Sequence, residues 1–346
     1  MTPGVLDLSD IRITDAPRVG PKVARLGQLA AGGWRVPDGY AITADALERW
    51  LPAAAATELD RLFAGWEGDL AALGQLSARA QGLIASHPLP LWLENAVFAA
   101  HERLRLRTGL GSGLRVAVRS SALREDGGGA SFAGQFSTYL GVRDDADVLH
   151  RIRECWASVY SARALEYRRR AGLPPRSADL AVGVMRLVDV RSAGVVFTLD
   201  PVTGDRGRMI VEANWGYGES VVSGQVTPDH WEVDRASGAV QVRRVGAKRA
   251  WSVFDPVAEQ VVLADLPADL ARRACLDDDE LGYLCLRAAE IEAAEGVPQD
   301  VEWAIATDGG MFFLQHRPET TWTGAPPRAF DPVGYALRNV FKVPGT

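Results

Sequence analysis

Cysteine is scarce in this chain, and long apolar runs are absent from it. Cys155, Cys275 and Cys285 are the three cysteines among 346 residues, and they form no CxxC pair. An odd number of dispersed cysteines argues against a disulfide framework and favours a reducing compartment. No run reaches the roughly 20 apolar residues that a membrane-spanning helix needs, and the first residues lack the pattern of a signal peptide. We therefore expect a cytoplasmic protein without membrane contact.

Basic charge is also in short supply. The 38 lysines and arginines are outnumbered by 44 acidic residues, which gives a formal net charge of -6. Without a dominant basic field, a nucleic-acid partner is disfavoured. Hydrophobic residues make up 47% and charged residues 24%, as in ordinary globular proteins. At this length a single core usually splits into more than one.

Two common nucleotide-binding loops are missing. No GxxxxGK[ST] sequence occurs, and the glycines of 109–113 precede an expected strand instead of following one, so they fail as a dinucleotide fingerprint. Arg119, however, ends an expected strand at 115–119. The loop after it is rich in small residues, which let backbone N–H groups approach a phosphate. Lys22 lies where a turn opens a helix, a position suited to anions. The alternatives are a flexible surface loop and a solvated lysine.

Periodicity predicts an α+β fold with two lobes. The expected helices cover 90–108, 145–170 and 279–295, and the expected strands cover 180–188, 193–199, 208–213, 230–234 and 239–244. We place the helical and first lobe at 1–190, including a phosphate-covering loop at 120–138. The second lobe would cover 191–320, and 321–346 would form a linker or tail.

A hairpin near the end of the chain carries the clearest chemical pattern. With Asp308 and Gly309 as a two-residue turn, Glu302 lies opposite Gln315, and Asp300 lies opposite Arg317. Alternation points these four side chains to one face. The apolar residues Val301, Trp303, Ile305, Phe312 and Leu314 would point to the other.

Oxygen ligands of this kind suit Mg²⁺, and an adjacent arginine suits phosphate oxygens. The competing interpretation is an edge hairpin with one polar, solvated face. A longer turn that used Gly310 would also slip the register and break the pairing.

Several motifs together resemble the ATP-binding domain shared by phosphoenolpyruvate synthase, pyruvate phosphate dikinase and rifampin phosphotransferase. In chain order these motifs are Arg119–Ala122, Glu125–Asp126, Ser131–Gln135, Gly194–Gly204, Glu212–Glu219, Val221–Gly224, Asp300–Trp303 and Leu314–Pro318. They appear in the family's order and cover about residues 10–320. Several long motifs in one order are far more specific than any one of them.

The resemblance implies an ATP-grasp fold, with ATP held between two lobes. It also implies that Lys22, Arg119 and Arg317 grip the phosphates and act in catalysis, with Arg317 neutralising charge on the transferred group. Gly134 and Thr138 would belong to the phosphate-covering loop. Glu302 and Gln315 would bind Mg²⁺, so the implied cofactors are ATP and Mg²⁺. Phosphoryl transfer needs positioning and charge neutralisation above all.

Two departures from the family pattern concern the nucleotide. Pro21 and Val23 flank Lys22 where the family commonly has glycines, so the backbone there is less free. Met185 stands where the family commonly has glutamine on the strand beside adenine. A thioether can pack on a purine but accepts hydrogen bonds weakly, which leaves adenine selectivity open.

A third departure concerns the carrier histidine. The five histidines are His87, His101, His150, His230 and His316, and none of them lies in the family's carrier context. We therefore expect the ATP-binding half of a dikinase-type phosphotransferase. Its partners would be a histidine carrier domain and an acceptor-binding domain on another chain. A stand-alone ATP-grasp ligase-like enzyme or direct kinase, and a non-catalytic nucleotide-binding module, are the alternatives.

Overall fold

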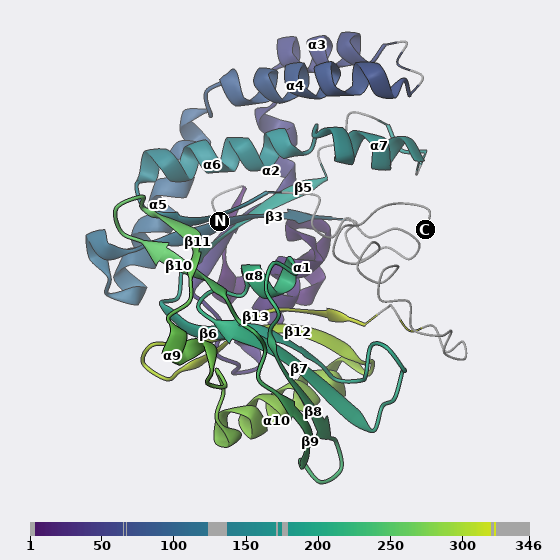
Figure 1. Ribbon diagram of the computed structural model, residues 1–346. Helices are drawn as coiled ribbons and strands as arrows, with labels where there is room; N and C mark the ends of the chain where they lie inside the picture. The colour runs from purple at the N-terminus through teal and green to yellow at the C-terminus, as the bar shows by residue number, and fades with distance from the viewer. Residues whose placement is uncertain are drawn as a thin grey trace. The chain divides into compact units, whose positions relative to one another are not determined.

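The computed structural model describes residues 4–64, 66, 68–123, 137–170, 172–174, 179–319 and 322. Helices and strands occur in blocks, so the predicted α+β class is confirmed (Figure 1). The chain divides into two compact units, Met1–Leu187 and Val188–Thr346. Among the described residues, no helix combines the length and the apolar character required to cross a membrane.

The first unit is built around a five-stranded antiparallel sheet in the order β1-β2-β5-β3-β4. Its strands are β1 (Val5–Asp7), β2 (Gly39–Ile42), β3 (Val116–Ala122), β4 (Thr138–Val142) and β5 (Leu180–Arg186). Its α-helices are α1 (Ala16–Ala31), α2 (Ala44–Trp50), α3 (Ala53–Phe63), α4 (Leu70–Ser86), α5 (Leu91–Thr108), α6 (Asp145–Ser158) and α7 (Ala162–Arg170). The short 3-10 helices are η1 (Leu8–Asp10), η2 (Ile13–Asp15) and η3 (Gly111–Gly113).

This sheet separates two apolar clusters. Val118 and Val184 point into the large core with residues of α2, α4, α5 and α6. Ala41 and Met185 point to the opposite face, where they pack with Val23 and other residues of α1. Figure 1 shows the same order of layers, with α1 on one side of β3 and β5 and with α6 and then α4 on the other.

The expected helix at 145–170 is two helices, because the chain turns at 159–161. The Ser158 hydroxyl donates to the Cys155 carbonyl at 2.6 Å, a bond that competes with helical pairing. The Ser161 hydroxyl then accepts from the Ala164 amide at 3.3 Å, as an N-cap does. α7 begins directly after this serine. The α5 prediction is confirmed, with Gly109 as a left-handed cap.

A buried histidine makes the stability of this unit sensitive to acid. His101 on α5 is 1% exposed, and its Nδ1 lies 3.3 Å from the Tyr40 hydroxyl. Burial, and after it the positive charge of Arg105, lowers the pKa of His101 below its usual 6.5. The unfolded chain therefore binds a proton more readily than the folded one as the pH falls below 6.5.

We expect the stabilising contribution of neutral His101 to be complete above pH 6.5 and to be lost as the pH falls from there towards its lowered folded pKa. Replacing His101 with glutamine should flatten this part of the profile in urea unfolding measured at a series of pH values. The exposed His150 on α6 gives the control, His150→Gln. Equal pH slopes for the wild type and His101→Gln would contradict the prediction.

The second unit contains a six-stranded antiparallel sheet in the order β13-β12-β6-β7-β8-β9. Its strands are β6 (Val190–Phe197), β7 (Arg208–Trp215), β8 (Asp229–Asp234), β9 (Val240–Arg244), β12 (Gln299–Ala306) and β13 (Met311–Pro318). Its helices are α8 (Glu219–Val222), α9 (Ala268–Ala271) and α10 (Asp278–Glu295), and α10 packs against β12 and β6.

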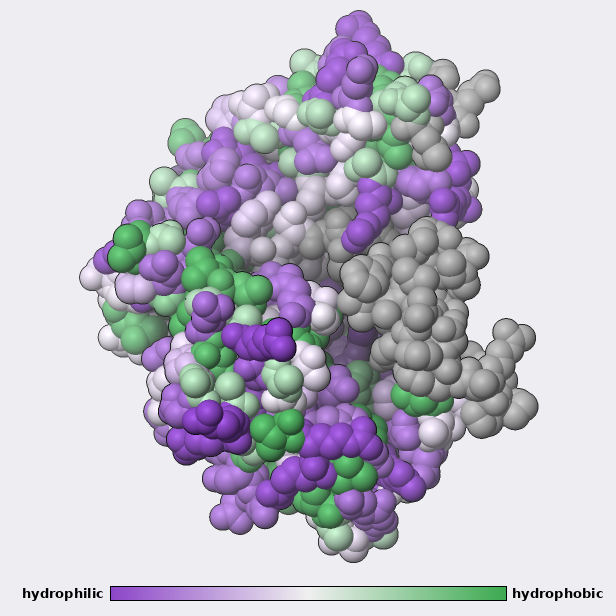
Figure 2. Space-filling model, viewed as in Figure 1, coloured by the Kyte–Doolittle hydropathy of each residue, from purple (hydrophilic) through white to green (hydrophobic). Residues whose placement is uncertain are grey.

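A two-stranded ribbon, β10 (Ala250–Asp255) with β11 (Gln260–Asp265), was not expected from the sequence. Asn214 of β7 donates to the carbonyl of Ala250, the first residue of β10, at 2.9 Å. Lys248, two residues before β10, forms a fully buried pair with Asp229 of β8, and its Nζ is 2.5 Å from each carboxylate oxygen. On the face shown in Figure 2, hydrophilic side chains predominate and hydrophobic ones form small scattered groups.

Candidate nucleotide-binding surfaces

In the first unit, three predicted residues share one face of the sheet. Arg119 on β3 is the register partner of Thr138 on β4 and of Gly183 on β5. Directly opposed residues point to the same face. Met185 lies two residues beyond Gly183 and therefore joins them. Its side chain is 4% exposed and belongs to the apolar cluster with α1.

Lys22 lies in α1, close to an interruption of that helix. Gly20 has φ 77 and ψ 155, so two helical segments meet there, and the second covers 21–31. Pro21 is the first residue of this second segment, a position that proline favours because its φ is already helical and no N–H is needed. The proline is therefore compatible with a helix start, and Lys22 follows in the first turn. The backbone amides of a first turn lack intrahelical partners and attract anions.

The predicted phosphate-covering loop is only partly described. Gly134 and its neighbours over 124–136 lie outside the described residues. Ser120 and Ser121, which begin the loop, still belong to β3 and are buried.

In the second unit, the predicted pairing of the hairpin is confirmed. Asp300 on β12 is the partner of Arg317 on β13, and Glu302 is the partner of Gln315. The predicted two-residue turn is wrong, however. The Ala306 amide donates to the Gly310 carbonyl at 2.9 Å, which leaves three residues, 307–309, in the turn. A bulge in the register next to Glu302 compensates for the extra turn residue, and the two shifts cancel.

The bulge moves two apolar side chains to the face of Glu302. Phe312 is paired with Ala304, which lies on that face because it is two residues from Glu302. Phe312 also packs with Val188, Ala306 and Leu314. The prediction that Phe312 and Leu314 point to the opposite face is therefore wrong. Val301, Trp303 and Ile305 are buried there as predicted, with Phe313 as the partner of Trp303.

Asp300 and Arg317 form a side-on ion pair. The Asp300 Oδ2 atom accepts from Arg317 Nε at 2.8 Å and lies 2.7 Å from Nη2. Burial, opposed by Arg317 and assisted by Glu302, raises the pKa of Asp300 to about 6. Burial lowers the pKa of Arg317, but the attraction of Asp300 outweighs it and raises the pKa overall. A guanidinium that is engaged through Nε and Nη2 can still donate from Nη1 to a further oxygen ligand.

Glu302 and Gln315 match the ligand preference of Mg²⁺. Both carry side-chain oxygens and stand directly opposite each other on one face, and Gln315 is 5% exposed. A nearby Asp300 oxygen, Oδ1, is buried without a hydrogen-bond partner among the described residues. A carboxylate and an amide form a sparse set, which suits an ion that keeps water and phosphate ligands. No group of three or more His, Cys, Asp or Glu side chains within the described ranges is arranged to hold a metal.

A polar row continues from the hairpin across the sheet, and the sequence interpretation missed it. Register partners run from Glu302 through Val195 to Glu212, and from there through His230 to Arg244. His230 Nδ1 lies 3.5 Å from a Glu212 oxygen. Strands are roughly 4.8 Å apart, so Glu212 stands about 10 Å from Glu302. The polar residues His230, Glu232 and Asp234, which alternate with buried ones in β8, were the available signal.

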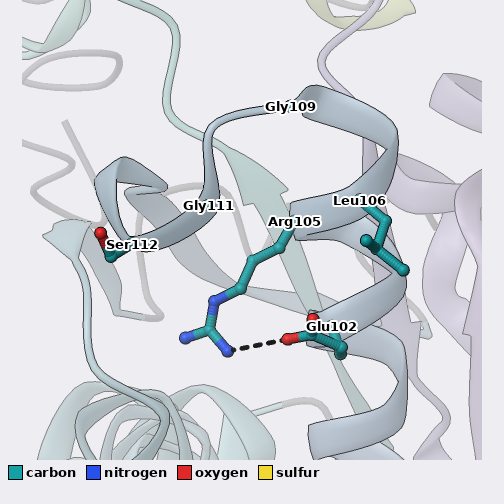
Figure 3. A pocket seen from close by; sticks show the side chains of 6 residues that line it. All are labelled: Glu102, Arg105, Leu106, Gly109, Gly111 and Ser112. Carbon is teal, nitrogen blue, oxygen red and sulfur yellow. Dashed lines mark hydrogen bonds and ion pairs between the residues drawn. The ribbon is translucent and has the colours of Figure 1, made fainter.

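A surface pocket at the end of α5 contains none of the predicted residues. It is lined by Glu102, Arg105, Leu106, Gly109, Gly111 and Ser112 (Figure 3). Arg105 points towards Glu102 at 3.4 Å, and it is also paired with Asp145 at 2.7 Å. Its charge is thus already compensated, and the pocket offers little to an anion.

Comparisons with known proteins agree with the sequence motifs. The model of the family described as "Pyruvate phosphate dikinase, AMP/ATP-binding domain" matches residues 16–331. A rifampicin phosphotransferase from Streptomyces sp is 38% identical over 94% of this chain and 37% of its own length. A probable phosphoenolpyruvate synthase from Methanothermobacter thermautotrophicus is 36% identical over 89% of this chain and 44% of its own. The prodigiosin synthesizing transferase PigC from Serratia marcescens is 36% identical over 92% and 33%. The chain thus spans less than half the length of these relatives.

Proposed function

Because this chain belongs to the family of AMP/ATP-binding domains of pyruvate phosphate dikinase, we propose that it is the ATP-binding half of a dikinase-type phosphotransferase. It binds Mg·ATP and passes a phosphoryl group to a carrier histidine on another domain or chain, with AMP and phosphate as products. The observation that carries this proposal is the hairpin, where Glu302 pairs with Gln315 and Asp300 pairs with Arg317 on one face.

The chemistry of the hairpin suits phosphoryl transfer. Glu302 and Gln315 would hold Mg²⁺, and the ion would supply positive charge that neutralises the phosphates. Arg317, aligned by Asp300, directs positive charge at the transferred group. Such a reaction depends on positioning and electrostatic stabilisation rather than on covalent chemistry by the protein.

We assign apolar side chains to the purine ring of ATP and basic side chains to its phosphates. Val188, Phe312 and Leu314 form an apolar cluster on the face of Glu302, and this cluster suits a purine ring. Lys22 and Arg119 supply cations for the phosphates, and Gly134 and Thr138 belong to the covering loop. Met185 remains the residue proposed to contact adenine.

The final acceptor is assigned to sequence outside this chain. The names of the three relatives mention different compounds, phosphoenolpyruvate, rifampicin and prodigiosin, and each relative extends well beyond the part that this chain matches. We therefore place the acceptor in a further domain or chain, next to the carrier histidine. A histidine intermediate divides one difficult transfer into two easier steps.

The test is incubation of the purified chain with β-labelled ATP, with and without a separately prepared histidine carrier domain. We expect label on the added domain together with release of AMP, and no phosphorylated small molecule from the chain alone. ADP formation by the chain alone would support a ligase or direct kinase instead. Tight ATP binding without turnover, even with the carrier domain present, would support a non-catalytic module.

A further inference from the structure

The interruption of α1 at Gly20 coincides with a very close approach to β3. A Cβ atom on Gly20 would lie 2.2 Å from the hydroxyl oxygen of Ser121 and 2.9 Å from its carbonyl oxygen. Real Cβ atoms do not come this near to other heavy atoms. Ser121 is fully buried, so it has no room to retreat. The backbone of Gly20 also has φ 77, a conformation that L side chains rarely adopt.

A second close approach between α1 and the sheet lies three residues further along the helix, at Val23. It involves Gly183 on β5. A Cβ atom on Gly183 would lie 3.1 Å from a methyl carbon of Val23 and 3.6 Å from Cγ of Arg119. Gly183 is the register partner of Arg119, and Ser121 lies two residues beyond Arg119 on the same face. The segment from Gly20 to Val23 therefore lies against β3 and β5 at two points close to Arg119, one at Ser121 on the same strand and one at its register partner Gly183.

We propose that Gly20 and, to a lesser degree, Gly183 are positioning residues that set Lys22 beside Arg119 so that both cations reach the same phosphates. Lys22 lies between the two contacts, so its backbone is fixed on both sides. The absence of a side chain at Gly20 permits the close approach, and Pro21 then starts the helix at once. This proposal rests on the proposed function, because it assumes that Lys22 and Arg119 bind the nucleotide.

The test compares Gly20→Ala with Gly33→Ala by calorimetry of Mg·ATP binding to the full chain. Gly33 is a matched control, since its φ is 81 and a Cβ there would meet nothing within 4 Å. Both variants carry the strain of a positive φ, but only Gly20→Ala pushes the chain away from β3. Losing one charge-assisted contact weakens binding about tenfold or more. We expect that loss for Gly20→Ala and less than about a twofold change for Gly33→Ala.

A double-variant cycle separates positioning from general damage. If Gly20 acts through Lys22, then Gly20→Ala should cost no further affinity once Lys22→Ala is present. A loss from Gly20→Ala that adds in full to that of Lys22→Ala would overturn the proposal, and so would wild-type affinity in Gly20→Ala. If Gly20→Ala does not fold, Gly183→Ala decides by the same cycle, with an expected loss of a few-fold. Gly183 lies within β5, and the three nearest atoms to a Cβ there belong to the side chains of Met185, Val23 and Arg119, so this contact is less severe than the one at Gly20.

Failure of the proposal can be told apart from failure of the proposed function. Wild-type ATP affinity in Lys22→Ala would overturn the positioning role outright, since there would be nothing to position. Arg119→Ala then reports on the function itself. Weakened binding in Arg119→Ala would leave the proposed function standing without the lysine.

Discussion

Replacing Glu302 with alanine is expected to abolish ATP-dependent turnover while the second unit stays folded. The carboxylate is proposed to supply the charged ligand of Mg²⁺, and the neutral amide of Gln315 does not replace it. The opposite face of β12, with Val301 and Trp303 fully buried, is untouched by the change. AMP release in the presence of a carrier domain measures turnover, and thermal unfolding measures the fold. Gln315→Ala should give a smaller loss in the same assay.

The matched control for this experiment is Glu212→Ala. Glu212 lies in the same row on the same face, two strands from Glu302, and its side chain is 40% exposed. It carries the same charge, so a purely long-range electrostatic effect would affect both variants. We expect Glu212→Ala to retain most of the activity. Normal turnover in both Glu302→Ala and Gln315→Ala would remove the metal assignment, and equal losses in Glu302→Ala and Glu212→Ala would show that charge alone is responsible.

The pairing of the hairpin was predictable from the sequence, although one step of the reasoning was wrong. Alternation and the Asp308-Gly309 pair indicated that Glu302 faces Gln315. The turn has three residues, which alone would have broken that pairing, and the bulge beside Glu302 restores it. A bulge has no reliable local signature, because the extra residue, here Leu314, is defined only by its lack of a partner on the other strand. The apolar cluster of Phe312 and Leu314 was missed for the same reason.

Local patterns also gave most of the strands and some of the helices, and they failed where tertiary contacts decide. The interruption of α1 at Gly20 depends on its contact with Ser121, a residue about 100 positions away in the sequence. The ribbon of β10 and β11 is anchored by residues of other strands, since Asn214 of β7 binds the Ala250 carbonyl and Asp229 of β8 pairs with Lys248 just before β10. Periodicity cannot report contacts of this range. It does report burial within one element, as in α5 and α10.

Replacing Arg317 with methionine is expected to lower both turnover and stability at neutral pH. The variant leaves the Asp300 carboxylate, which is 6% exposed, without its counter-charge. An uncompensated buried charge costs about 2–3 kcal/mol when the lost partner is partly exposed, as Arg317 is. Without Arg317, which holds the Asp300 pKa down, that pKa lies above 6. The cost therefore shrinks as the pH falls towards about 6 and stays small below it, because protonated Asp300 needs no cation. Urea unfolding of Arg317→Met and wild type at pH 5 and pH 8 measures this difference.

The double variant Asp300→Asn with Arg317→Met separates the structural role of the arginine from its chemical role. Asparagine keeps the shape of Asp300 but carries no charge, so most of the lost stability should return at pH 8. Turnover should stay low, because no cation is left to neutralise the transferred phosphoryl group. Recovery of turnover together with stability would show that Arg317 serves only to compensate Asp300. Recovery of stability alone would place the positive charge of Arg317 in the reaction itself, with Asp300 as the group that holds it in place.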